Sequence, residues 1–116
     1  MPDVTETKAK LMKLVEEINH ENGYEKIEYG EQDRHKERMF IRIVGQKESL
    51  RIVPTVRGWD VGLMGQSLNK KMYEYMRQLT GRKHDKLGYR AKEDMPKWEV
   101  DNFELVKKAV RWYSKT

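Results

Sequence analysis

The segment from residue 38 to residue 56 constrains the fold most, because a glycine-containing turn joins two halves rich in β-branched and aromatic side chains. Apolar side chains alternate from Arg38 to Val44, which predicts a strand. Gly45 to Glu48 predicts a hairpin turn, and Leu50 to Val56 predicts the returning strand. Pro54 cannot donate a ladder hydrogen bond, so we expect the far end of that strand at a sheet edge or a bulge.

Three shorter segments extend this predicted sheet. Glu25 to Tyr29 alternates weakly and predicts a short strand, followed by a polar loop over Gly30 to His35. Gly58 to Val61 predicts one more short strand, and Lys97 to Val100 predicts the last one. We therefore expect a small antiparallel sheet of four to five strands.

Helical periodicity predicts three helices around this sheet. Asp3 with Glu6 resembles a capping pair, and Asn22-Gly23 is a typical helix stop, which predicts a helix over residues 4–22. Ser67 is expected to cap a second helix that ends at Gly81. Its apolar stripe consists of Leu68, Met72, Tyr75, Met76 and Leu79.

The third helix is expected near the end of the chain. Asp101 with Glu104 fits a capping box, and the predicted buried face consists of Phe103, Val106, Ala109, Val110 and Tyr113. A chain of 116 residues is one domain by length. We therefore predict a single α+β domain over residues 1–116, in the order α-β-β-β(-β)-α-β-α.

This layout resembles that of the MmcQ/YjbR-like family, small proteins with a twisted antiparallel sheet and flanking helices. The resemblance is carried by Met39 to Val44, Leu50 to Val53, a helix ending at Thr80-Gly81, Lys97-Trp98-Glu99-Val100, and Trp112-Tyr113-Ser114. It is one of order and spacing over most of the chain, without a diagnostic motif. What the resemblance implies is a DNA-binding role without catalysis.

The chain lacks the residues that several classes of protein need for their function. The chain has no cysteine, which excludes disulfides, cysteine-ligated metals and a thiol nucleophile. Its three histidines are isolated, and the only acid-x-Lys triplet, Glu6-Thr7-Lys8, lies in a predicted helix rather than beside paired strands. No phosphate-loop or serine-hydrolase motif is present. We therefore predict a non-enzymatic protein with no metal and no cofactor. The absence of an apolar run of about 20 residues further predicts a cytoplasmic protein without a membrane partner.

The distribution of charge is the main functional signal. Residues 1–34 hold five basic and nine acidic side chains, whereas residues 66–92 hold eight basic and two acidic ones. A basic segment favours an anionic partner such as nucleic acid, because Lys and Arg neutralise phosphates. A lysine-rich solvated surface would give the same count, and the sequence leaves that alternative open.

The expected binding surface starts on the second helix. Lys70, Tyr73 and Arg77 recur at helical spacing, opposite the apolar stripe. The sequence leaves open whether Tyr73 packs at a core margin instead. The surface would continue into the segment after the helix, through Arg82, Lys83, Lys86, Tyr89 and Arg90. Basic residues interleaved with aromatic ones are typical of surfaces that track phosphates and stack bases.

Two weaker signals accompany this one. Phe40, Arg42 and Arg51 share one face of the predicted sheet, and form a second contact platform unless a helix covers them. Gly62 and Gly65 precede the second helix, whose first amides are able to receive a phosphate. The alternative function is a protein-interaction module, an inhibitor or adaptor, that docks an acidic partner through the same basic surface.

Overall fold

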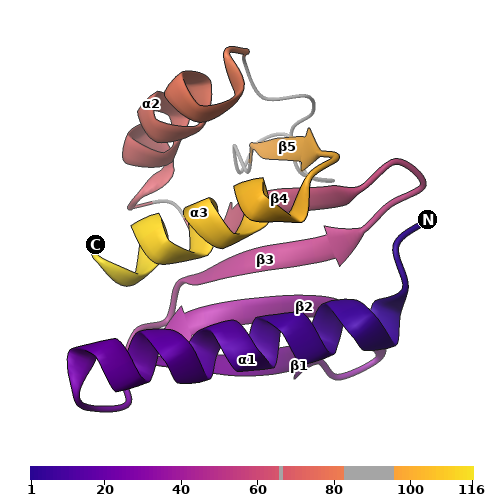
Figure 1. Ribbon diagram of the computed structural model, residues 1–116. Coiled ribbons are helices and arrows are strands. Elements are labelled where there is room, and N and C mark those ends of the chain that lie inside the picture. Colours follow the sequence, from indigo (N-terminus) through magenta and orange to yellow (C-terminus); the bar gives the residue numbers. More distant parts are fainter. Residues whose placement is uncertain (66, 83–95) are drawn as a thin grey trace.

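The computed structural model describes residues 1–65, 67–82 and 96–116 (Figure 1). Its elements follow in the order α1 (Val4–Asn22), β1 (Ile27–Gln32), β2 (His35–Ile43), β3 (Ser49–Pro54), β4 (Trp59–Met64), α2 (Asn69–Thr80), β5 (Lys97–Val100) and α3 (Phe103–Ser114). The expected α+β class and element order are confirmed.

The five strands form one antiparallel sheet in the order β1-β2-β3-β4-β5. α1 and α3 lie across one face of this sheet, α1 toward β1 and α3 toward β4 and β5 (Figure 1). α2 lies beyond β5, at the end of the sheet opposite α1. The order of the strands therefore separates the first two helices by the width of the sheet.

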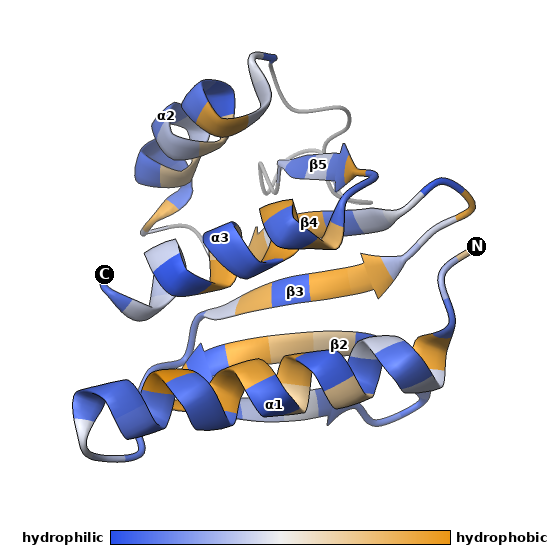
Figure 2. Cartoon of the chain, viewed as in Figure 1, coloured by the Kyte–Doolittle hydropathy of each residue, from blue (hydrophilic) through white to orange (hydrophobic). Residues whose placement is uncertain are grey.

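The core lies between the sheet and its helices. Strand alternation directs Leu50 and Ile52 of β3 and Val61 of β4 toward the helices, where all three are fully buried. Trp98 of β5 is the largest fully buried side chain. Figure 2 shows hydrophobic positions on α1, α3 and the strands, and a mostly hydrophilic α2. No helix in the described part of the chain is long and apolar enough to cross a membrane.

β1 and β4 are longer than the sequence predicts. β1 continues to Gln32, so the expected loop over residues 30–35 shrinks to a turn at Asp33-Arg34. Gly30 belongs to the strand because the ring of its cross-strand partner Phe40 lies over it: a Cβ on Gly30 would meet the Phe40 Cζ at 2.3 Å. An aromatic ring that covers a strand glycine replaces the packing that the glycine lacks.

Pro54 lies at the end of β3, as expected. β3 pairs with β4 up to Pro54 and Trp59, whereas its pairing with β2 reaches only Ile52. Pro54 therefore sits where the ladder to β2 has already stopped.

The caps predicted for α1 are correct, whereas the N-caps predicted for α2 and α3 are wrong. Asp3 accepts a hydrogen bond from the Glu6 amide at 2.8 Å, and Gly23 ends α1 in the left-handed region. Ser67 does not cap α2, because its hydroxyl donates to the Glu48 carboxylate instead. Asp101 does not cap α3 either. The extended backbone of Asn102 directly precedes that helix, and its side chain accepts from the Glu104 amide at 2.9 Å.

Candidate nucleic-acid interface

α2 is fixed to the domain by its apolar stripe. Met72 and Met76 are fully buried, as the helical spacing predicts. Tyr75, on the same stripe, stacks on Trp112 of α3 with ring centroids 5.0 Å apart. Gly81 ends the helix with φ of 73°, in the left-handed region that glycine adopts without strain. The opposite side of the helix is left for polar and charged side chains.

Two cations, Lys70 and Arg77, lie on that side, and Lys71 lies at its edge, one helical turn before Tyr75 of the apolar stripe. Lys70, Lys71 and Arg77 are all exposed, and within the described ranges none of them forms an ion pair. Glu74 is the only acidic residue of α2. The sequence prediction did not include Lys71, because that residue lies outside the stripe from Lys70 to Arg77. The helix therefore presents a net positive charge to solvent.

Arg82 extends this charge toward β5. Its guanidinium donates to the carbonyl oxygen of Glu99, and its own carbonyl accepts from the indole of Trp98 at 3.4 Å. These contacts tie the residue to β5 while its side chain stays exposed. Arg82 therefore lies at a fixed place just beyond the end of α2.

Tyr73 packs at the margin of the core. Its ring meets the Trp98 ring edge-on, with centroids 5.6 Å apart and planes inclined by 76°. Lys70 and Arg77 lie one turn to either side of it on the helix, so the two cations flank a half-buried ring. The predicted stripe is present, but much of the surface of its aromatic member is already in contact with the protein.

Phe40, Arg42 and Arg51 share the sheet face that points away from the core, as the alternation predicts. Phe40 pairs with Arg51 across β2 and β3. Arg42 is already engaged, because its Nε lies 2.8 Å from the Glu28 carboxylate and its guanidinium lies 5.3 Å from the centre of the Phe40 ring. α1 and α3 both lie on the other face, so neither covers this platform.

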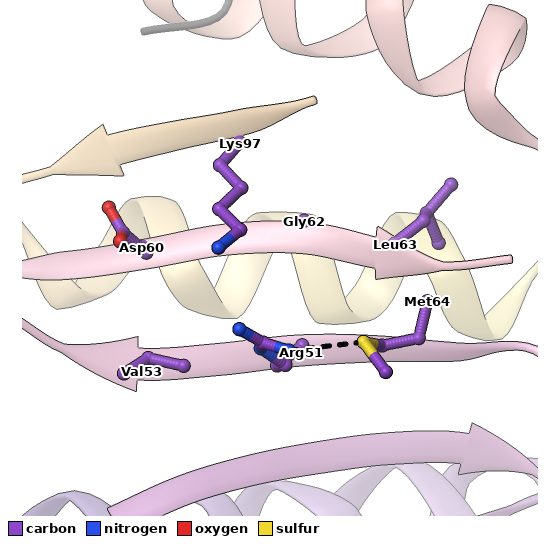
Figure 3. Close-up of a pocket in the computed structure, with 7 residues that line it drawn as sticks. All are labelled: Arg51, Val53, Asp60, Gly62, Leu63, Met64 and Lys97. Carbon is purple, nitrogen blue, oxygen red and sulfur yellow. Dashed lines mark hydrogen bonds between the residues drawn. The ribbon is translucent and has the colours of Figure 1, made fainter. Parts of the chain in front are cut away.

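Arg51 lies in a small cavity on that face, shown in Figure 3. Burial lowers the pKa of its guanidinium, nearby Arg38 lowers it further, and Asp60 acts in the opposite direction. Its Nη1 lies 3.3 Å from the sulfur of Met64. The cavity measures about 10 Å³, roughly the space of one water molecule. The cavity beside Arg51 therefore has no room for a base. The strands that carry Arg42 and Arg51, β2 and β3, are separated from α2 by β4 and β5 (Figure 1).

The remaining predicted residues, Lys83, Lys86, Tyr89 and Arg90, lie outside the described residues. Their place relative to α2 stays a prediction.

A carboxylate lies where the sequence suggested a phosphate, just before α2. The Glu48 side chain accepts from Ser67 and lies against Gly65, where a Cβ would meet its Cγ at 2.4 Å. Gly65 has φ of 137°, which a side chain would strain. Because an anion of the protein lies next to this helix end, a phosphate there would be repelled.

Three acidic residues of α1, Glu6, Glu17 and Glu21, form ion pairs at the other end of the domain. Arg111 of α3 lies 2.8 Å from Glu21 and 3.8 Å from Glu17. The hydrogen bond from Arg111 lowers the pKa of the exposed Glu21 carboxyl and raises that of Arg111 itself. Glu6 pairs with Lys10 at 3.3 Å. The acidic N-terminal helix therefore does not neutralise the cations of α2.

The described residues contain no group of three His, Asp or Glu side chains arranged to hold a metal ion. Comparisons of the chain with protein-family models, with curated proteins and with solved structures found no match. The layout resemblance to the MmcQ/YjbR-like family is not tested by these comparisons and stays a prediction.

Proposed function

We propose that this protein binds nucleic acid without catalysing a reaction and with little base specificity. Its contact surface consists of the exposed cations of α2 and the residue beyond it, namely Lys70, Lys71, Arg77 and Arg82, hereafter the α2 cations. The observation that carries the proposal is that Lys70, Lys71 and Arg77 are exposed and, within the described residues, have no ion-pair partner.

The arrangement of charge supports the same partner class. The acidic helix α1 lies at one end of the sheet, and the α2 cations lie at the other (Figure 1). Phosphate neutralisation by Lys and Arg gives sequence-independent affinity, which suits a surface that carries charge but few donors for base edges. The cytoplasmic location expected from the sequence is compatible with this role and stays a prediction.

A salt series tests the proposal. Four phosphate contacts predict that affinity for a short duplex falls about 100-fold between 50 and 200 mM salt. The double variant Lys70→Gln/Arg77→Gln should lower that dependence to about tenfold, because two contacts remain. The matched control is Lys13→Gln, which removes an exposed lysine from α1 at the other end of the sheet. Equal losses in the control and the double variant would contradict the assignment.

The same cations also suit an acidic protein surface, since electrostatic complementarity acts on carboxylates as it does on phosphates. Two outcomes together would replace the proposal with this alternative. The purified protein would show no affinity for oligonucleotides at 50 mM salt, and a purified acidic partner would bind it in nuclease-treated solution and lose affinity in Lys70→Gln/Arg77→Gln.

A further inference from the structure

Two aromatic rings meet at the junction of α2 and α3. Tyr75 and Trp112 are stacked, with centroids 5.0 Å apart and an interplanar angle of 11°. The Tyr75 hydroxyl donates to the carbonyl oxygen of Lys108 at 3.1 Å, which ties it to α3. Both side chains are only partly buried. The junction therefore leaves part of a rigid aromatic pair at the surface.

Each ring has a lysine one helical turn before it. Lys71 precedes Tyr75 on α2, and Lys108 precedes Trp112 on α3, so each lysine lies on the same helix face as its ring. Both lysines are exposed and lack an ion-pair partner among the described residues. We call these four residues the α2–α3 junction.

The neighbouring lysine of α3 points elsewhere. The Lys107 ammonium lies 3.5 Å from Glu104, and its side chain lines the groove against α1 together with Lys10 and Lys13. Lys107 and Lys108 are thus adjacent in sequence but face different helices. Substituting each of these two lysines in turn therefore separates the effect of the junction on binding from the effect of net charge.

We infer that the partner is a single-stranded nucleic acid that runs from the α2 cations across the α2–α3 junction; this inference rests on the function proposed above. Lys71 and Lys108 contact phosphates, and the exposed parts of Tyr75 and Trp112 contact unpaired bases. In a duplex the bases are stacked on each other and turned inward, so surface rings between two helices reach only bases that are unpaired.

The internal contacts of the junction favour this use. The rings already restrict each other, and the bond from Tyr75 to Lys108 fixes the tyrosine further. Binding to preordered side chains loses less conformational entropy than binding to mobile ones. Aromatic contact also depends little on base identity, because every base has a π-face. The junction thus adds affinity without adding sequence specificity.

The test compares the intact protein's affinities for oligo-dT of about 12 nucleotides and for a duplex of the same length. We expect tighter binding of the single strand, and quenching of tryptophan fluorescence that Trp112→Phe abolishes. Lys108→Gln should weaken single-strand binding about fivefold at 0.1 M salt, whereas Lys107→Gln should leave it nearly unchanged. Trp112→Leu should weaken it about tenfold, and Trp112→Phe should retain most of the affinity.

The outcomes separate the two proposals. If the protein binds both nucleic acids with equal affinity, and Lys107→Gln and Lys108→Gln have equal effects, the proposed single-strand contact at the junction is wrong. The proposed binding of nucleic acid by the α2 cations is then still supported. No binding of either nucleic acid overturns the proposed function, and the junction with it. Thermal melts identify any variant that unfolds. If Trp112→Leu unfolds, the comparison of Lys107→Gln with Lys108→Gln still tests the junction. Both of these substitutions replace a side chain whose ammonium is at the surface, so we expect both variants to fold.

Discussion

At two places in and beside this sheet, a glycine allows a close contact that a larger residue would block. The ring of Phe40 rests on Gly30, and the backbone of Val100 and Asp101 rests on Gly58. In both places a methyl group has no room, but the obstacles differ. An aromatic ring is able to rotate away, whereas a strand backbone moves only with the sheet.

The first prediction compares these two glycines. Gly30→Ala should lower the free energy of unfolding by about 1–3 kcal/mol, because its Cβ displaces the Phe40 ring. Gly58→Ala should cost more, since its Cβ would lie 2.0 Å from the Val100 carbonyl oxygen. Urea denaturation measures both. Pairing Gly30→Ala with Phe40→Leu should recover part of the loss, and an undiminished loss would contradict the proposed clash.

The second prediction concerns the hydroxyl of Tyr113, which joins the two strands of the central hairpin. It donates to the Glu48 carbonyl at 2.9 Å and accepts from the Ile43 amide at 3.2 Å. Tyr113→Phe leaves both backbone groups without this partner and should cost about 1–3 kcal/mol in urea denaturation. Tyr29→Phe is the control, because it removes a bond to the Glu31 side chain and leaves no backbone group unpaired. Equal losses would contradict this role of Tyr113.

Among the elements, local patterns predicted which residues form a helix or strand better than they predicted what covers each face. The cap at Asp3, the hairpin and the buried pair Met72 and Met76 followed from spacing within a few residues. The continuation of β1 through Gly30 to Gln32 was missed because a glycine followed by polar residues is typical of a loop. Only the partner strand, with Phe40, shows otherwise.

In the candidate site, too, local patterns predicted exposure better than they predicted contacts between elements. Helical periodicity predicted the exposure of Lys70 and Arg77 correctly. It did not reveal that Tyr73 meets Trp98 or that Tyr75 stacks on Trp112, because those partners come from elements later in the chain. A one-dimensional charge count also gave no sign of the exposed Lys108 beside Trp112, since acidic residues just before α3 cancel its charge in the count.

The third prediction concerns the contact between α1 and α3. Arg111 lowers the folded-state pKa of Glu21 below its ordinary value of 4.5. The stability from this pair is therefore present above pH 4.5 and is lost as the pH falls through the lowered pKa. Thermal melts between pH 3 and 6 should show a shallower acid loss in Arg111→Gln than in the unaltered protein. Lys107→Gln, which removes a different α3 cation, should keep the original slope, and identical slopes in all three proteins would contradict the prediction.

At the scale of the whole molecule, the sheet keeps opposite charges apart. α1, which carries Glu17 and Glu21, and α2, which carries Lys70, Lys71 and Arg77, lie at its two ends (Figure 1). With the proposed polyanionic partner, such a distribution would orient the protein before contact and so accelerate association at low ionic strength.

The fourth prediction follows from this separation. Charge reversal in Lys70→Glu/Arg77→Glu should lower the association rate constant for an oligonucleotide more than Lys70→Gln/Arg77→Gln does. The difference should shrink above about 0.5 M salt, where the screening length falls to a few ångströms. Stopped-flow measurements over a salt series give these rates. Reversal that changes only the dissociation rate would show that steering plays no part.

The pairing of β4 with β5 has a consequence for the path by which the chain reaches its native state. The meander from β1 to β4 joins strands through short turns, whereas β5 pairs with β4 only after the polypeptide returns from α2. Distant contacts carry a larger loop-closure entropy and form more slowly than near ones. We expect β5 to dock late, so that Trp98 completes the core and immobilises α2 in the last kinetic phase.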